Sequence, residues 1–167
     1  DEPGPAAQRA REGEVRRGLS PSKIRVSTAR VVLTSELIDG TFPDYERVIP
    51  QGNDKKMEVD NAAFAQAVDR VSTLSSDKGR AVKLTINDGK LVLSVNNPDS
   101  GSATEELPVE YGFDPLEIGF NARYLLDISG QLESGTAEFQ LADSGSPTMV
   151  RDGKDVSALY VLMPMRV

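Results

Sequence analysis

Histidine and cysteine are both absent from the 167 residues of this chain. Without histidine, a Ser-His-Asp triad and the usual imidazole general base are excluded. Without either residue, ordinary zinc, haem and iron–sulfur sites are excluded, and so are disulfides. Only carboxylate, Lys, Tyr or Ser/Thr side chains could carry out catalysis, and the sequence predicts no metal, no cofactor and no catalytic residue.

Long apolar runs and a leader peptide are also missing. No stretch of about 18 apolar residues could span a bilayer, and the chain does not open with a charged segment followed by an apolar one, as a secretory signal does. A cytoplasmic protein is therefore expected. The length, with 38% hydrophobic residues, is enough for one full domain and part of another.

Positive charge is scarce and unevenly distributed. The net charge of −7 argues against a protein that holds phosphates by bulk attraction. Residues 1–30 carry seven Lys/Arg against four Asp/Glu, whereas the other 137 carry twelve against twenty-two. The acidic part is the part patterned like a folded domain, so any contact with DNA is expected to use a local face.

The N-terminal residues 1–22 have few large apolar side chains. In residues 1–20 only Val15 and Leu19 could contribute to a core, so this segment is expected to be mobile, or weakly helical over 6–17. From Lys23 the pattern changes. Residues 23–27 and 30–35 are rich in β-branched side chains and predict two strands.

An internal repeat fills the rest of the chain, because the order strand–helix–strand–strand–strand occurs twice. Helices are predicted at 62–74 and 122–132. Asn61 and Asn121, sixty residues apart, precede these helices, and each side-chain oxygen could accept a bond from a first-turn N–H. The other predicted elements are strands at 57–59, 81–87, 90–96, 104–111, 116–120, 136–142, 148–151 and 157–165.

Two such repeats predict an α+β domain over 51–167 with a pseudo-two-fold axis. One helix with about four strands buries a single sheet face, whereas two units side by side can pack both helices on a shared antiparallel sheet surface. Asp88-Gly89 and Asp152-Gly153 are dipeptides that favour tight hairpin turns. The strands at 23–35 would belong to an earlier domain.

Three carboxylates that are close in sequence are candidates for chemistry. Asp39, Asp44 and Glu46 could serve acid–base or metal catalysis, which makes a carboxylate-dependent hydrolase an alternative function. Their spacing matches no EF-hand loop, and each also suits a turn or a solvated surface. No glycine pattern for nucleotide phosphates is present.

Residues 160–167, YVLMPMRV, allow two interpretations. They could form a final strand that buries Leu159 and Val161. However, Pro164 cannot donate a ladder hydrogen bond, and methionine, which flanks it on both sides, is common on adaptable binding surfaces. An apolar chain end of this kind could leave an exposed groove. The pattern alone does not choose between the core strand and the groove.

Three motifs resemble the bacterial beta sliding clamp. The segment LIDGTFPDYERVIP at 37–50 is similar to the connection between the second and third domains of that family, and IGFN at 118–121 and YVLMPMR at 160–166 resemble the third domain. The resemblance covers about 23–167, with the motifs in the family's order. It implies a DNA-clamp fold in which 23–50 end domain two and form the connector, and 51–167 form domain three.

The resemblance also implies a function without catalysis. Family members are head-to-tail dimeric rings that encircle duplex DNA, and they dock DNA polymerase III subunits, the clamp loader, repair polymerases, ligase and mismatch-repair proteins. These partners insert a linear motif rich in Gln, Leu and Phe into an apolar pocket between domains two and three. The pocket positions that match here are Pro43, Arg47, Val48, Asn121, Tyr124, Gly145, Pro147, Val161, Leu162, Met163, Pro164, Met165 and Arg166. This match favours the groove interpretation of the tail.

Further positions match the family's ring interface. They are Leu74 and the acidic edge Glu105-Glu106, which is expected to lack a basic partner within this chain. Arg70 and Arg123, on the two predicted helices, could face the DNA phosphates or be ordinary solvated arginines.

The chain also departs from the family. Gly79 occupies a rim position that often carries a larger side chain, and residues 1–22 match domain two poorly. Because domain one and most of domain two are unmatched, the chain alone is not expected to close a ring. An alternative function is therefore an isolated peptide-binding fragment that cannot encircle DNA.

Overall fold

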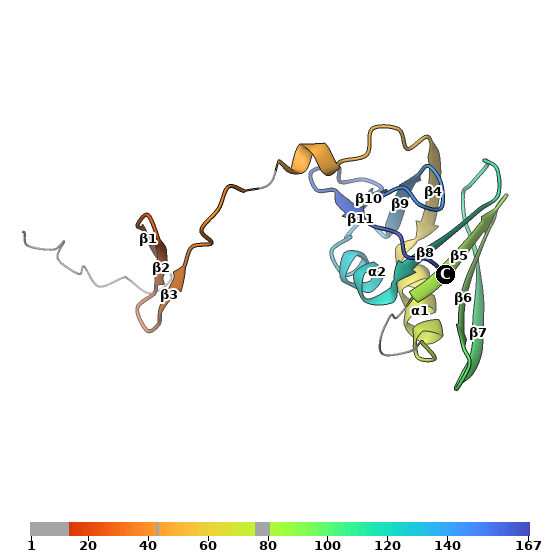
Figure 1. Cartoon of the computed structure of the whole chain (residues 1–167), viewed down its shortest axis with the longest axis horizontal. Coiled ribbons are helices and arrows are strands. Elements are labelled where there is room, and N and C mark those ends of the chain that lie inside the picture. The colour runs from red at the N-terminus through yellow and green to blue at the C-terminus, as the bar shows by residue number, and fades with distance from the viewer. Residues whose placement is uncertain (1–13, 43, 76–80) are drawn as a thin grey trace, which may run out of the picture. The chain divides into compact units, whose positions relative to one another are not determined.

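The structure is a computed structural model that describes residues 14–42, 44–75 and 81–167 (Figure 1). The chain divides into two compact units, Asp1–Pro43 and Asp44–Val167, and the domain predicted over 51–167 lies within the second of them. The elements are β1 (Arg16–Leu19), β2 (Lys23–Ser27), β3 (Val32–Glu36), the 3-10 turn η1 (Tyr45–Val48), β4 (Lys55–Asp60), α1 (Asn61–Ser72), β5 (Ala81–Asn87), β6 (Lys90–Asn97), β7 (Gly101–Pro108), β8 (Leu116–Asn121), α2 (Ala122–Ser129), β9 (Thr136–Leu141), β10 (Thr148–Asp152) and β11 (Tyr160–Leu162).

The first unit contains a three-stranded antiparallel sheet in the order β1-β2-β3. The two predicted strands are confirmed as β2 and β3, but β1 was not predicted. Arg16 and Arg17 pair with β2 in this strand, so the helical alternative over 6–17 is wrong at its described end, while residues 1–13 lie outside the described residues. No described side chain of this unit is buried, which fits a sheet that has no core of its own.

The second unit contains two four-stranded antiparallel sheets, β11-β10-β9-β4 and β7-β6-β5-β8. The α+β class and the duplicated element order are confirmed. The predicted shared sheet is in fact two sheets, because the repeats exchange their first strands. β4 pairs with β9, with Met57 opposite Phe139, and β8 pairs with β5, with Leu84 opposite Ile118 in register. Each sheet therefore needs both repeats.

The exchanged strands β4 and β8 lie at the outer ends of their sheets. Each is contacted by the segment that follows the last strand of its own repeat. Glu110, after β7, bridges Glu58 of β4 through two backbone bonds of 3.0 and 2.9 Å. Met165, after β11, bridges Gly119 of β8, and its N–H donates to the Gly119 carbonyl at 2.8 Å. The pseudo-two-fold symmetry thus extends to the C-terminal tail.

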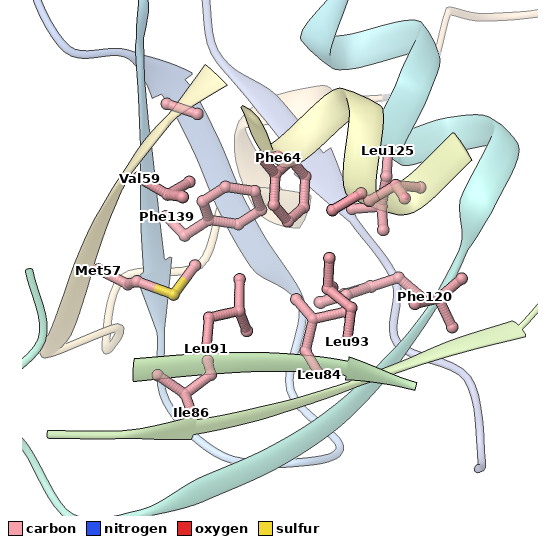
Figure 2. Close-up of a cluster of buried hydrophobic side chains, with 14 of the residues drawn as sticks. Met57, Val59, Phe64, Leu84, Ile86, Leu91, Leu93, Phe120, Leu125 and Phe139 are labelled. Carbon is pink, nitrogen blue, oxygen red and sulfur yellow. The ribbon is translucent and has the colours of Figure 1, made fainter. Parts of the chain in front are cut away.

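One continuous apolar core holds the two sheets and both helices together (Figure 2). The rings of Phe64 from α1 and Phe139 from β9 meet edge-to-face with centroids 5.3 Å apart, and Phe120 and Leu125 extend the cluster toward α2. Burial of each such side chain contributes about 2 kcal/mol. Since the cluster takes side chains from both repeats, neither repeat can keep its core without the other.

The first helix begins differently from the prediction. Asp60, not Asn61, caps α1 by accepting the Ala63 N–H at 2.7 Å. The buried Asn61 amide donates instead to the carbonyls of Ser129 at 2.9 Å and Leu132 at 3.4 Å. Asn61 therefore joins the start of α1 to the end of α2.

The second helix begins as predicted. Asn121 caps α2 and accepts the Arg123 N–H at 2.9 Å. Both helices end earlier than expected, at Ser72 and Ser129. Neither of them, within the ranges that the structure describes, is long and apolar enough to cross a bilayer.

Only one of the two Asp-Gly dipeptides forms a tight hairpin turn. Asp88-Gly89 joins β5 to β6, with Gly89 at a φ of 68° that suits glycine. The prediction for Asp152-Gly153 is wrong, because β10 ends at Asp152 and β11 begins only at Tyr160. The sequence does not reveal the hydrogen bonds that Asp152 accepts.

Asp152 is buried and holds two loops together. Its Oδ2 accepts the N–H groups of Glu133 and Ser134, each at 2.8 Å. Its Oδ1 accepts those of Lys154 at 2.9 Å and Asp155 at 3.1 Å. Hydrogen bonding by the Ser134 side chain, and then by the backbone N–H groups of Lys154 and Ser134, holds the pKa of Asp152 far below its usual 3.8.

Asp152→Asn is expected to lower the thermal unfolding midpoint at pH 7 by about 5 °C or more, because the amide offers one acceptor oxygen where the carboxylate offers two. The folded-state pKa lies below the unfolded one, so the stabilisation is complete above pH about 5 and is lost as the pH falls through the lowered pKa. Calorimetry at pH 7 and pH 3 should therefore show a smaller difference at pH 3. The control is Asp99→Asn, at an exposed turn position; an equal loss in both variants would contradict this role.

Candidate functional site

A groove of about 780 Å³ lies along the outer edge of β8, between the β9–β10 loop and the C-terminal tail. It is lined by Lys83, Leu116, Glu117, Ile118, Gly119, Ser144, Gly145, Pro164, Met165, Arg166 and Val167. β8 is exposed to the groove because it is the outermost strand of its sheet. Figure 1 shows the tail ending beside β8 and β5.

The tail leaves the core at one residue. Leu162 is the last residue of β11 and is only 5% exposed, whereas Met163 is 65% exposed. Leu159, which the core interpretation would bury, is 45% exposed. Pro164 has no N–H to continue the ladder with β10, so the chain turns away after Leu162. Both interpretations of the tail therefore hold in part: an anchor in the core is followed by a groove wall.

Gly119 lets the tail approach β8 closely. A Cβ at this position would lie 2.7 Å from the Met165 carbonyl oxygen, 2.8 Å from one methyl carbon of Val167 and closer still to the other. Any side chain here would have to displace the backbone of the tail. The glycine is therefore required by this contact and not by a turn.

The opposite wall, the β9–β10 loop, is fixed by a carboxylate. Asp143 Oδ1 accepts the N–H groups of Gly145 and Ser146 at 2.8 Å each, and Oδ2 accepts the Ser146 hydroxyl at 2.9 Å. These bonds, led by that from the Gly145 N–H, hold the pKa of Asp143 below its usual value. The Asn53 amide donates to the Pro147 carbonyl at 2.9 Å, which secures the other end of the loop.

Charged side chains also line the groove. Lys83 Nζ lies 2.8 Å from Glu117 Oε2, and this hydrogen bond holds the pKa of Glu117 below its usual range. Arg166 on the tail is exposed. The groove thus combines an apolar part with a polar part.

The structure gathers only some of the predicted pocket residues in this groove. Gly145, Pro164, Met165 and Arg166 line it. Leu162 is buried in the core, and its place in the pocket stays a prediction. Several residues that line the groove were not predicted: Lys83, Leu116, Glu117, Ile118, Gly119, Ser144 and Val167. Only the register between the tail and β8 could have indicated them, and the tail's single bridge to Gly119 is not visible in the sequence.

Three more predicted pocket residues, Asn121, Tyr124 and Met163, are not among the residues that line this groove. The antiparallel bridge of Met165 to Gly119, extended by two residues, brings the exposed Met163 level with Asn121. Tyr124, one turn into α2, is 57% exposed. Asn121 already accepts the Arg123 N–H with its oxygen, so its NH₂ group is the part that could contact a ligand.

The remaining predicted pocket residues lie on other elements. Val161 pairs with Met149 of β10, and the half-buried Pro147 precedes the same strand. Arg47 and Val48 are exposed on η1, where Arg47 Nε lies 2.9 Å from Asp44 Oδ2. Pro43 and the rim residue Gly79 lie outside the described residues.

The predicted ring-interface residues show one clear correction. Glu105 and Glu106 do have basic partners: Arg70 binds Glu105 with both Nε and Nη2, at 2.6 and 3.0 Å, and Lys90 lies 3.4 Å from Glu106. Arg70 holds the pKa of Glu105 below its usual value. The Arg70–Glu105 pair was missed because its members are 35 residues apart in sequence. Leu74 is half-buried against the core.

The two arginines predicted to face DNA are both exposed on helices. Arg70 is engaged with Glu105, whereas Arg123 lies only within 4.0 Å of Asp127, four residues further along α2. An exposed ion pair between residues four apart on one helix, such as Arg123–Asp127, contributes little to stability. A contact with DNA stays a prediction, and Arg123 is the less engaged of the two.

The three candidate carboxylates form no site in the described part of the chain. Asp39 belongs to the first unit, whereas Asp44 and Glu46 belong to the second. All three are exposed, and Asp44 is paired with Arg47. In the described ranges no group of His, Cys, Asp and Glu is close enough to hold a metal ion. The hydrolase alternative has no structural support.

Residues 46–166 match the family model described as DNA polymerase III beta subunit, C-terminal domain. The beta sliding clamp of Caulobacter vibrioides is 52% identical over 149 residues, covering 89% of this chain and 40% of that protein. The beta sliding clamp of Pseudomonas aeruginosa is 42% identical over 156 residues, covering 93% of this chain and 42% of that protein.

Solved structures give the same result. The sliding clamp of Bartonella birtlesii bound to griselimycin superposes with a TM-score of 0.85 at 59% identity, covering 92% of this chain and 41% of that chain. The Caulobacter crescentus clamp, with polyethylene glycol bound to a putative beta-motif tethering region, has a TM-score of 0.85 at 52% identity over 92% of this chain and 41% of that chain.

The chain therefore spans about 40% of the length of the curated relatives it matches. These relatives are sliding clamps, which are accessory to a polymerase and not enzymes, as the sequence analysis expected. Given the family match over 46–166 and the identities above, this chain belongs to the DNA polymerase III beta subunit family and carries its C-terminal domain.

Proposed function

We propose that this chain is the partner-docking domain of a bacterial processivity clamp, and that the groove beside β8 takes up a linear peptide motif. The observation that carries the proposal is the path of the tail. It leaves the core at Leu162 and lies against β8, so that Met163 is exposed and Met165 lines a groove. The expected partners are DNA polymerase III subunits, the clamp loader, repair polymerases, ligase and mismatch-repair proteins.

The chemistry of the groove suits such motifs. The Leu and Phe side chains of a peptide would bury apolar surface against Met163, Pro164 and Met165, while Arg166 would offer donors to its carbonyls or carboxylates. Methionine side chains are unbranched and flexible, so they can adapt to different partners on a backbone fixed by Gly119. Relatives carry ligands: griselimycin in the Bartonella birtlesii clamp, and polyethylene glycol in the Caulobacter crescentus one.

The other end of the same sheet offers a second docking edge. β7 is the outer strand of the order β7-β6-β5-β8, and an open strand edge can pair with another polypeptide. In the proposed ring this edge, with Leu74 and Glu105, would meet a domain of the neighbouring subunit. The bond between Arg70 and Glu105 would have to be shared or exchanged on closure.

Met163→Ala combined with Met165→Ala is expected to weaken binding of a peptide rich in Gln, Leu and Phe by about thirtyfold, because anchoring side chains typically contribute about 2 kcal/mol. Fluorescence anisotropy with a labelled peptide measures this. Phe113→Ala, which removes an exposed ring from the segment between β7 and β8, is the control that should leave affinity unchanged. Unchanged affinity in the double variant would show that the groove is assigned wrongly.

Gly119→Ala is expected to push the tail away from β8 and to weaken the same peptide by about tenfold or more, equivalent to 1.4 kcal/mol. The matched control is Gly52→Ala, since a Cβ at Gly52 meets no atom within 4 Å. Thermal unfolding separates the two possible effects, because the tail contact lies outside the core. Affinity equal to that of the Gly52 variant would mean that the tail's seat on β8 does not shape the site.

A polypeptide of these 167 residues is expected not to form a closed ring, because the proposed partner of the β7 edge is a different domain. Size-exclusion chromatography with light scattering should give the mass of a monomer, and nicked circular DNA should not retain the protein. A stable two-fold ring held on nicked DNA would contradict this expectation and would rule out the isolated peptide-binding fragment as an alternative.

A further inference from the structure

We propose that Asn53 is a positioning residue for peptide docking. Its side-chain amide holds the two ends of the β9–β10 loop together, so that Ser144 and Gly145 stay in place as a wall of the groove. Asn53 is not itself among the residues that line the groove, and it would act only through this loop. The proposal rests on the proposed function and names the contact that keeps one wall of the docking site in position.

Asn53 lies at the point where the pairing between β4 and β9 stops. The last register pair of that ladder is Lys55 opposite Leu141, and Leu141 is also the last residue of β9. Beyond this pair the chain runs through the loop to Thr148, where β10 begins. A side chain two residues before β4 is therefore well placed to take over where the ladder ends.

The Asn53 amide binds both ends of the loop at once. Its Nδ2 donates to the Gln140 carbonyl at 2.7 Å and to the Pro147 carbonyl at 2.9 Å. An NH₂ group has two hydrogens, so each carbonyl can receive one of them. The two acceptors stand on either side of the groove-lining Ser144 and Gly145. The side chain thus forms a bridge across the neck of the loop.

An amide suits this place better than a carboxylate or an alkyl group. Asn53, Gln140 and Pro147 are all half-buried, so a carbonyl that lost its donor would be only partly compensated by water. A carboxylate would offer no hydrogen to either carbonyl. Lys55 supports the bridge from the same segment, because its Nζ donates to the Ala142 carbonyl at 2.9 Å.

The bridge has a different effect from the bonds that Asp143 accepts. Those bonds, from the Gly145 and Ser146 N–H groups, lie within the loop and fix its internal shape. The Asn53 bonds connect the loop to the segment before β4 and fix where the loop stands. Without them we expect the loop to keep its shape but to move relative to the tail. A docked peptide would then keep its contacts with the tail and lose those with the facing wall.

Asn53→Ala is expected to weaken binding of the labelled peptide rich in Gln, Leu and Phe by about three- to tenfold, the range that the loss of one ordering hydrogen bond spans. Fluorescence anisotropy well below the unfolding midpoint measures this. The amide NMR signals of Gly145 and Ser146 should shift in the same variant, which a loss of overall stability alone would not cause. Asn53→Ser keeps one donor, so it should show a smaller loss, and it serves as the test if Asn53→Ala does not fold.

Asn97→Ala is the matched control, because Asn97 Nδ2 likewise donates to a distant backbone carbonyl, that of Leu74, at 2.9 Å. It should lower the unfolding midpoint and leave both the peptide affinity and the Gly145 and Ser146 signals unchanged. Equal peptide affinity in the Asn53 and Asn97 variants, or unshifted loop signals in the Asn53 variant, would overturn the proposal. Failure of the unaltered chain to bind the peptide would instead refute the proposed function.

Discussion

The exchange of first strands between the two repeats is the constraint on which the rest of the structure depends. β4 completes the sheet of the second repeat and β8 completes the sheet of the first. Phe139 and Phe64, one from each repeat, meet in the middle of the core. Because each repeat lacks a strand without the other, the fold forms as one unit. The exchange also makes β8 an outer strand, and only an outer strand leaves an edge for the tail.

The two exchanged strands show how one geometry supports different chemistry. At β4, Glu110 makes two backbone bonds to Glu58, and the hollow of about 350 Å³ there is lined by Glu58, Asp60 and Glu110. At β8, the Met165 N–H of the tail donates to the Gly119 carbonyl at 2.8 Å, and Met165 and Arg166 line a larger groove. The fold supplies both edges, so the difference in function has to come from side chains.

Sequence predicted the elements well where a local pattern determines them. The apolar spacing of Phe64, Ala67 and Val71 marked α1, and Asp88-Gly89 marked a hairpin, because helix periodicity and turn chemistry are local. It failed where a distant partner decides. Asn61 is bonded to the carbonyl of Ser129 in α2 and to that of Leu132 just beyond it, 68 and 71 residues away, which left the α1 cap to Asp60. Asp152 likewise binds a loop 18 and 19 residues earlier in the chain.

In the candidate site, too, the sequence predicted the features set by a local pattern and not those set by a distant partner. The tail motif indicated a groove, but not its opposite wall, since Leu116, Glu117 and Lys83 carry no motif of their own. They are brought to the site by pairing between β5 and β8 and by the one bridge from Met165 to Gly119. The pattern of the tail residues identifies the wall against which a ligand's apolar side chains would be buried. The residues of the opposite wall are brought together only by strand register.

Rigidity and adaptability are divided between backbone and side chains in this groove. The tail packs closely against β8 at Gly119. Asp143 fixes the facing loop through three hydrogen bonds. Next to these fixed walls, the Met163 side chain is exposed. A fixed groove limits the entropy lost on binding, while a flexible thioether lets different apolar side chains fit. Both properties are needed if one groove is to exchange several partners, because a fully rigid surface would select one of them.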